Sequence, residues 1–273
     1  MKKRKSFLSA KGRAVIVAMD HPLYSWPCRG LEDRGRLLKQ VARADAIIAS
    51  YGTIRDLRPL FGKAEPILKL DLTSVTLGTN YPLSEYVPAW TVDDALRLKV
   101  GAVLTFVQLG APFEIAALKF AGEVAAACDR AGLTYVCEIM PIESAMFPDP
   151  AAPEAIAAAS RAGAELGAHV IKTTMPVPAA KVAEAAEACG IPVILAGGAF
   201  SSDREGLLSE VSTAVASGAA GVAFGRNVWG AADPAAMVAS LREAVHGKGA
   251  GAFSAEVGTG SAQKMRQTKE SRA

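Results

Sequence analysis

Short apolar runs alternate with amphipathic segments along most of the chain. The apolar runs have the length and flanking loops of buried parallel strands, whereas the segments between them carry apolar residues at helical spacing. The pattern predicts strands at residues 14–20, 46–49, 67–71, 102–107, 135–140, 170–173, 192–196 and 221–224. It predicts helices at residues 32–43, 91–99, 113–131, 153–166, 179–189, 202–217 and 234–245.

Several of the predicted helices begin or end at recognisable signals. Thr91 is a typical N-cap, and Asp93 and Asp94 follow it in the first turn, where negative charge is favourable. Pro153 stands at the start of one helix, and Gly190 follows the end of another. These signals support the alternation of strands and helices that the apolar pattern predicts.

Eight apolar strands with helices between most of them predict a single closed (β/α)8 TIM barrel. A doubly wound open sheet is the alternative, but no glycine fingerprint of a dinucleotide-binding fold follows the first strand. We expect the barrel domain to span residues 1–247. Residues 248–273 are rich in glycine, serine and charge, and we expect them to form a flexible tail.

The composition is that of a soluble globular protein, with 51% apolar residues, 21% charged residues and a net charge of +3. The excess positive charge lies at the two ends of the chain, where we interpret it as solvated rather than as a nucleic-acid site. The 4 cysteines lack metal-ligand spacing, and no apolar run has the length of a signal peptide or a membrane span. We therefore expect a cytoplasmic protein with neither a nucleic-acid nor a membrane partner.

Charged residues interrupt several predicted strands near their carboxyl ends, where catalytic groups lie in barrels of this kind. Because side chains alternate along a strand, Asp20 shares the inward face of the first strand, and Lys69 and Asp71 share one face of the third. Glu138 and Lys172 occupy the corresponding face of the fifth and sixth strands. If these faces line the lumen, the five side chains converge near the barrel top and neutralise one another in pairs.

Lys172 is the strongest candidate for a catalytic nucleophile. Burial of an ammonium group is costly and lowers its pKa toward the neutral, nucleophilic form. Such an amine can form a Schiff base with a carbonyl compound. Glu138 is expected to pair with Lys172 or Lys69. Lys69 either supports catalysis as a neighbouring cation or serves as a structural partner of Asp71.

Asp20 and the histidines have alternative interpretations. Asp20 either assists proton transfer or caps the segment that follows it. His21 points away from Asp20 in strict alternation, and it either holds the loop or touches the substrate. His169, at the start of its strand, is expected to be structural, and His246, near the tail, carries no functional signal.

Glycine residues end the seventh and eighth predicted strands, at Gly197, Gly198 and Gly225, and Arg226 follows. Glycine lets backbone N–H groups approach an anion, and the helix that follows favours negative charge at its start. Arg226 can add a charge-assisted contact. Because barrel enzymes often bind phosphate after these two strands, we expect a phosphate or sulfonate here rather than plain turns.

The chain resembles the class I aldolases related to archaeal-type fructose-bisphosphate aldolase and deoxyribose-phosphate aldolase. The matching segments are, in family order, residues 18–22, 29–33, 171–174, 194–198 and 224–229. They run from the first strand to the last helix. The Lys-Thr, Ala-Gly-Gly and Gly-Arg-Asn-Val-Trp motifs together are fairly specific.

The resemblance implies a (β/α)8 barrel, a Schiff base on Lys172 and an acidic role for Asp20. It also implies phosphate contacts from the glycine loops and Arg226. Members of this family need no metal or other cofactor. They form homo-oligomers built on pentameric rings, which implies a pentamer or decamer.

The sequence departs from the fructose-bisphosphate aldolases at two positions. Those enzymes carry an acid/base tyrosine in a Tyr-Pro dipeptide after the fifth strand, whereas this chain has Met140 before Pro141, and methionine cannot transfer a proton. Pro22 also stands where glycine is frequent. The candidates to replace the tyrosine are Glu138, Glu143, Tyr24 and His21.

The sequence therefore predicts a class I aldolase, an aldehyde-lyase of carbohydrate metabolism acting on a phosphorylated or similarly anionic ketose or aldehyde. Related members include a thiolase and a transaldolase-like synthase, which remain alternatives. A further alternative is a phosphosugar isomerase or lyase that forms no imine and uses Asp20 and Glu138 as acid and base. A ligand sensor without catalytic activity is the alternative from outside the enzymes.

Overall fold

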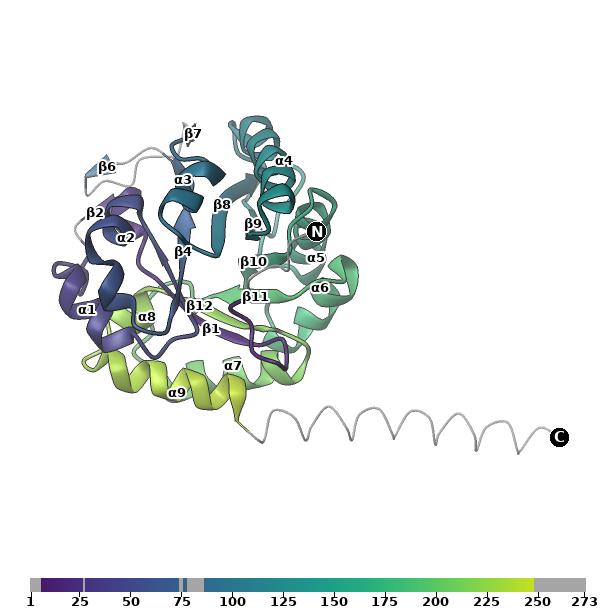
Figure 1. Ribbon diagram of the computed structural model, residues 1–273. Coiled ribbons are helices and arrows are strands. Elements are labelled where there is room, and N and C mark those ends of the chain that lie inside the picture. The colour runs from purple at the N-terminus through teal and green to yellow at the C-terminus, as the bar shows by residue number, and fades with distance from the viewer. Residues whose placement is uncertain (1–5, 27, 74–75, 78–85, 248–273) are drawn as a thin grey trace.

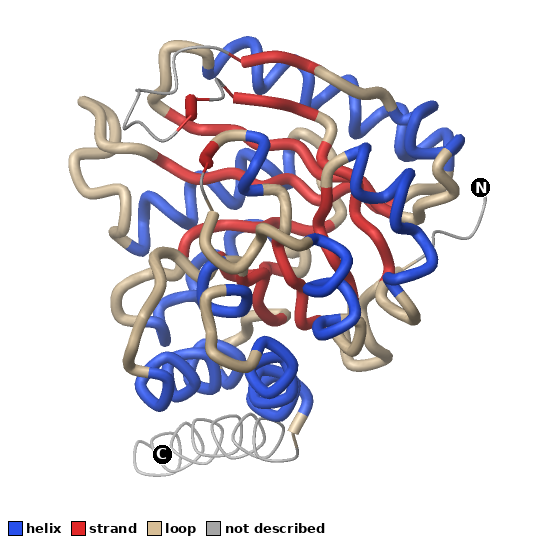
Figure 2. The backbone as a smooth tube through the Cα atoms, turned by 90° about the vertical axis from the view of Figure 1, so that its left-hand side faces the viewer, coloured by secondary structure: helices blue, strands red, loops and turns tan. Residues whose placement is uncertain are grey.

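Eight parallel strands of the computed structural model close into a barrel, with helices arranged around it (Figure 1 and Figure 2). In order around the barrel they are β1 (Ala14–Ala18), β12 (Gly221–Phe224), β11 (Val193–Ala196), β10 (Val170–Thr174), β9 (Thr134–Pro141), β8 (Ala102–Leu109), β4 (Glu65–Lys69) and β3 (Ala46–Ala49). Pairing of β3 with β1 completes the closure, which confirms the predicted barrel and excludes the open sheet.

The structure describes residues 6–26, 28–73, 76–77 and 86–247. The predicted tail at residues 248–273 lies outside this range. Within it, the α-helices are α1 (Arg34–Val41), α2 (Tyr51–Leu57), α3 (Val92–Arg97), α4 (Glu114–Ala131), α5 (Pro153–Glu165), α6 (Val182–Cys189), α7 (Arg204–Ala216), α8 (Arg226–Trp229) and α9 (Pro234–His246). Within the described part of the chain, no helix combines the length and apolar character needed to cross a membrane.

Short elements complete the fold. They are the 3-10 helices η1 (His21–Leu23), η2 (Arg58–Phe61) and η3 (Ala179–Lys181), the pair β2 (Ser25–Trp26) with β6 (Thr76–Leu77), and the pair β5 (Asp71–Thr73) with β7 (Tyr86–Pro88). Most of these lie in the loops beyond the carboxyl ends of the strands, so they shape the side of the barrel on which chemistry is expected.

The barrel strands are buried on both faces, and their alternation divides the core in two. One cluster of apolar residues fills the lumen and includes Ile16, Ile67, Val136 and Val170. The other lies between the strands and the outer helices. Because side chains two positions apart share a face, Lys69, Glu138 and Lys172 follow the lumen residues Ile67, Val136 and Val170 toward the barrel top.

Each predicted helix corresponds to an observed one, but α2 and α8 were not predicted. Ser50 caps α2 by accepting a hydrogen bond from the Thr53 backbone at 3.3 Å. The helix contains a glycine and two β-branched residues, Thr53 and Ile54, which are weaker helix formers than alanine, so its sequence has a weak helical signal. The α8 segment has four residues, too few to show a helical period.

The third strand ends earlier than predicted. β4 stops at Lys69, and the chain leaves the barrel so that Asp71 begins β5, which pairs antiparallel with β7. Leu70 nevertheless stays buried, and its carbonyl accepts hydrogen bonds from the backbones of Ala89 and Trp90. Asp71 is therefore not a lumen residue of a continuous strand, although its side chain turns back to contact Lys69.

Two histidines have structural contacts at the amino-terminal side of the barrel. His169 accepts a hydrogen bond from the Tyr135 backbone at 2.9 Å and contacts Asp129, which agrees with its predicted structural role. His246 contacts the Asp45 carboxylate at 2.7 Å. Asp45 also accepts from the Val15 backbone at 2.7 Å, so the last helix is tied to the first strand.

A substitution at Gly221 tests how closely β12 and β1 must approach to close the barrel. Its φ of +133° disfavours other residues, and a Cβ atom there would lie 1.9 Å from the Ala14 carbonyl oxygen. We expect Gly221→Ala to lower the free energy of unfolding by about 2–4 kcal/mol, measured by urea denaturation. The control is Gly122→Ala in the middle of α4, where a Cβ meets no atom within 4 Å. That change should stabilise the helix by about 0.5–1 kcal/mol, and equal effects of the two substitutions would contradict this account of the closure.

Candidate active site

A cavity of about 500 Å³ opens at the carboxyl ends of the barrel strands. Its polar lining side chains are His21, Tyr24, Lys69, Glu138, Lys172, Thr174, Glu210 and Arg226. The predicted glycines Gly197, Gly198 and Gly225 also line it. Most of the sequence-predicted site residues therefore share one space.

Lys172 and Glu138 form an ion pair in this cavity. Lys172 lies on β10 directly opposite Glu138 on β9, because the two strands pair in parallel with these residues in register. The Lys172 Nζ lies 2.5 Å from the Glu138 Oε1, and both side chains are buried. The carboxylate compensates the amine for its loss of hydration, and it is placed to exchange a proton with it.

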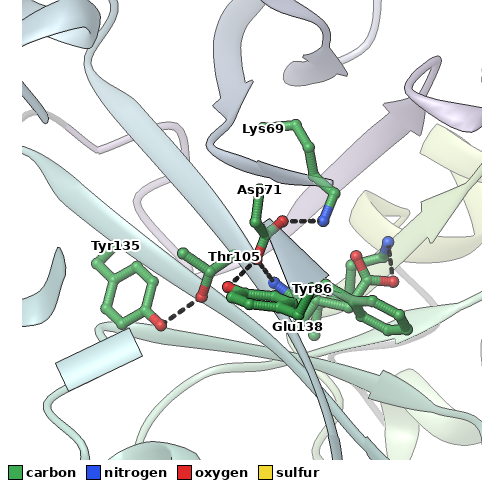
Figure 3. Close-up of polar contacts among 8 residues, drawn as sticks. Lys69, Asp71, Tyr86, Thr105, Tyr135 and Glu138 are labelled. Carbon is green, nitrogen blue, oxygen red and sulfur yellow. Dashed lines mark hydrogen bonds and ion pairs between the residues drawn. The ribbon is translucent and has the colours of Figure 1, made fainter. Parts of the chain in front are cut away.

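Lys69 forms a second buried ion pair, with Asp71. The Asp71 carboxylate also accepts hydrogen bonds from the Tyr86 hydroxyl and from the Phe106 backbone N–H, each at 2.6 Å. Figure 3 shows Lys69 and Tyr86 converging on this carboxylate from different segments. The Lys69 Nζ lies 5.1 Å from the centre of the Phe106 ring, which adds a favourable cation–π contact.

The charge of Lys69 is held in place by this network. Burial opposes the ammonium form, but the carboxylates of Asp71, Glu138 and Asp20 outweigh burial and raise the pKa of Lys69. Burial and Asp71 likewise raise the pKa of Tyr86, so its phenol remains a hydrogen-bond donor. Lys69 therefore brings a fixed positive charge to the cavity wall.

Asp20 lies behind the wall of the cavity. It follows β1 by two residues and is 1% exposed, and in the described part of the chain neither of its carboxylate oxygens has a hydrogen-bond partner. It lines a smaller cavity of about 280 Å³, together with Arg34 and Ser50. The predicted convergence thus holds for Lys69, Glu138 and Lys172, whereas Asp20 and Asp71 do not line the cavity. The capping alternative for Asp20 is not observed, because its side chain makes no cap hydrogen bond to η1.

His21 and Tyr24 form a hydrogen-bonded pair on the cavity wall. The Tyr24 hydroxyl lies 2.7 Å from the His21 Nδ1, and the His21 ring packs edge-on against Trp229. Burial lowers the pKa of His21 to about 4, opposed by Asp20 and assisted by Arg226 and Lys172. Burial, Asp20 and Glu138 raise the pKa of Tyr24. Both rings are therefore uncharged at neutral pH, and each carries one N–H or O–H group that can donate a hydrogen bond.

The glycine loops after β11 and β12 lie side by side. The Asn227 side chain joins them, donating to the carbonyls of Gly197 at 2.7 Å and Ala199 at 3.0 Å and accepting from the Ser201 backbone at 2.8 Å. A Cβ on Gly197 would lie 2.6 Å from the Phe224 ring, so only glycine fits there. Asn227 was not predicted as a site residue, although a polar side chain directly after the Gly-Arg motif was a usable signal.

The remaining cavity wall is largely apolar. It includes Phe106, Met140, Met175, Val177 and Leu207. Met140 occupies the position of the family tyrosine, and its sulfur lies 3.9 Å from the Thr174 hydroxyl. Glu143 is exposed and does not line the cavity, which weakens its case as a replacement acid/base group. The segment after β10 contributes several of these residues, and no sequence pattern marked it.

In the described ranges, no group of three or more His, Cys, Asp and Glu side chains has the arrangement of a metal-ion site. The side chains that line this site offer amines, carboxylates, an imidazole and a phenol for chemistry. The buried lysine and its carboxylate lie at the carboxyl end of a (β/α)8 barrel, where the active sites of barrel enzymes lie. Residues 14–231 match the DeoC/LacD family aldolase model, and the chain belongs to this family.

Relatives and solved structures agree with this assignment. The chain is 31% identical over 239 residues to 2-amino-4,5-dihydroxy-6-oxo-7-(phosphonooxy)heptanoate synthase of Streptomyces griseus, covering 87% of this chain and 86% of the relative. It is 32% identical over 248 residues to 2-amino-3,7-dideoxy-D-threo-hept-6-ulosonate synthase 1 of Archaeoglobus fulgidus, covering 90% and 91%. A Schiff-base-forming fructose-1,6-bisphosphate aldolase structure superimposes with a TM-score of 0.77 at 26% identity, covering 88% of this chain and 96% of that one.

The depressed pKa of His21 predicts an acid-sensitive contribution to stability. The unfolded chain binds a proton at His21 near the ordinary value of 6.5, whereas the folded protein does so only near 4. The contribution is therefore fully present above the unfolded value and is lost as the pH falls toward the folded value. From about pH 7 to about pH 5, we expect the wild type to lose roughly 2 kcal/mol more unfolding free energy than His21→Asn. Parallel losses in urea titrations of the two proteins would contradict this interpretation.

Proposed function

We propose that the protein is a class I aldolase whose Lys172 forms a Schiff base with a phosphorylated carbonyl substrate. The observation that carries the proposal is the buried Lys172 amine, which lies against Glu138 inside a cavity large enough for a small sugar phosphate. Membership of an aldolase family supports the same chemistry. So does the likeness to a Schiff-base-forming aldolase.

Lys172 and Glu138 together can complete the proton transfers of imine formation. Glu138 takes a proton from the Lys172 ammonium, and the neutral amine then forms a bond to the carbonyl carbon. The carbonyl oxygen is protonated and departs as water, which leaves an iminium ion. This ion accepts the electron pair of the bond between its α and β carbons when that bond breaks, which leaves an enamine. In the reverse direction the enamine supplies that pair to form the bond.

The oxygen atom of the other carbonyl fragment also needs an acid/base group. Glu138 is the leading candidate, because it lies in the cavity and has already exchanged a proton with Lys172. Tyr24 and His21 also line the cavity. Asp20 supports the reaction through its charge, since its carboxylate is covered and lies behind the wall.

The glycine loops and Arg226 are proposed to bind the phosphate. Gly197, Gly198 and Gly225 present backbone close to the cavity, and Arg226 supplies a positive charge at its rim. Anchoring one end of the substrate there fixes the distance from its carbonyl to the Lys172 amine. The Streptomyces griseus relative is named for a phosphonooxy product. That name, and that of the Archaeoglobus fulgidus relative, describe synthases, which favours C–C bond formation as the direction of use.

Lys172→Met tests the imine directly. With dihydroxyacetone phosphate or another phosphorylated ketone, borohydride reduction of the wild type should give a stable adduct of one ligand per chain in intact-mass spectrometry. The variant should give no adduct and should lose at least about 10³-fold in turnover, because the covalent intermediate cannot form.

The matched control is Lys181→Met, a surface lysine paired with Glu184. It should trap substrate as the wild type does. Substantial turnover by Lys172→Met, or an adduct mapped to another lysine in the wild type, would sink the proposed role of Lys172.

Arg226→Met tests the anion anchor. The loss of one charge-assisted contact of about 1.5–3 kcal/mol should raise KM for the phosphorylated ketone by roughly 10- to 100-fold. The same variant should handle the corresponding ketone without phosphate much as the wild type does. Arg204→Met, on the outer helix α7, serves as the charge-matched control. Equal losses with both ketones would argue against phosphate binding by Arg226.

A further inference from the structure

The cavity contains two buried lysines, Lys69 and Lys172, and each has one carboxylate partner. Both amines are close to fully buried, at 3% and 5% exposure. Burial alone therefore does not determine which of the two reacts with a carbonyl group. The difference lies in the carboxylates.

Asp71 and Glu138 differ in the number of hydrogen bonds that they accept. Asp71 accepts from Lys69 on one oxygen and from both the Tyr86 hydroxyl and the Phe106 N–H on the other. Among the hydrogen bonds of the described residues, Lys172 is the one donor to Glu138. A carboxylate that accepts several hydrogen bonds is held in one position, and its charge is stabilised. Asp71 is accordingly the more firmly fixed counter-charge of the two.

A separate pair of short strands, outside the barrel sheet, positions Asp71 and Tyr86. β5 and β7 form an antiparallel pair that carries Asp71 at one end and Tyr86 at the other. The Tyr86 ring stacks on Phe113 and packs edge-on against Phe120, which fixes the direction of its hydroxyl group. The Phe106 N–H comes from the neighbouring barrel strand β8. The Asp71 carboxylate is thus held by three segments of the chain.

From this geometry we infer that Asp71 and Tyr86 are positioning residues that keep Lys69 protonated and thereby exclude it from imine formation. The selection of Lys172 as the reactive amine rests on the proposed function. The charge state of Lys69 does not, because it is set by the Asp71 network, with Glu138 and Asp20 nearby, in the absence of any substrate. Lys69 then serves as a permanent cation beside the reaction, and the site forms one covalent intermediate instead of two.

Asp71→Asn removes the negative charge beside Lys69 with little change in side-chain shape. If the amide oxygen occupies the position of Oδ2, it still accepts from Tyr86 and Phe106, and its NH2 group faces Lys69. An ammonium group has no lone pair to accept that N–H, whereas a neutral amine does. The substitution therefore removes the counter-charge and favours the neutral, nucleophilic form of Lys69.

Reductive methylation with formaldehyde and cyanoborohydride measures this charge state without any substrate, because neutral amines react and ammonium groups do not. Peptide mapping should show little modification of Lys69 in the wild type at about pH 8, and at least about tenfold faster modification in Asp71→Asn. Surface lysines such as Lys181 should be modified at the same rate in both proteins, which shows that the reagent was equally active in the two reactions. Equal rates at Lys69 in the two proteins would overturn the inference.

Tyr86→Phe is a second, milder variant that keeps the ring packing and removes one donor to Asp71. It should raise the rate of Lys69 modification by a smaller factor than Asp71→Asn. This variant decides the question if Asp71→Asn fails to fold, as judged by its circular dichroism spectrum. An unchanged Lys69 rate in a folded Tyr86→Phe protein would then count against the role of the network.

The double variant Lys172→Met/Asp71→Asn tests the consequence for catalysis. Lys172→Met alone should trap no ketone phosphate with borohydride, whereas the double variant should regain an adduct, mapped to Lys69. A folded double variant that methylates at Lys69 but traps no ketone would contradict the claim that charge alone excludes Lys69. Failure of the wild type to trap any ketone would instead count against the proposed function, and the methylation result would stand separately.

Discussion

The burial of two ammonium groups in one barrel lumen is the constraint on which the rest of this site depends. Each buried amine requires a carboxylate within hydrogen-bond distance, and the chain supplies the two in different ways. Glu138 reaches Lys172 because neighbouring parallel strands place the two in register. Asp71 contacts Lys69 from the start of β5, after β4 has ended. The two pairs therefore differ in surroundings although they share a cavity.

This difference gives the two lysines different proposed roles within the cavity. In the proposed mechanism, the pair formed by Lys172 and Glu138 moves a proton during covalent chemistry, whereas Lys69 contributes a constant positive charge. A third cationic group, Arg226, lies at the rim beside the glycine loops. The Asn227 amide holds those loops at a fixed separation. The largely apolar remainder of the wall, including Phe106 and Met140, keeps these charges in a poorly hydrated environment where their interactions are strong.

The sequence sufficed to predict the barrel, the lumen positions of Lys69, Glu138 and Lys172, and the glycine loops, because period-two alternation and strand order are local properties. It did not place Asp71, since alternation assumes that a strand continues and nothing local marked its end at Lys69. It also did not show that Asp20 is covered: the chain turns into η1 directly after it, and it lines the smaller cavity instead of the larger one. The contact between Asp71 and Tyr86 joins residues 15 positions apart, which no short-range pattern reveals.

A crystal structure of the wild type after soaking with a phosphorylated ketone and borohydride tests the central claim most directly. The account predicts continuous electron density from the Lys172 Nζ to the ligand, with the phosphate against Gly197, Gly225 and Arg226. It also predicts that Lys69 remains paired with Asp71. Density joined to Lys69, or a phosphate bound away from the glycine loops, would contradict the account.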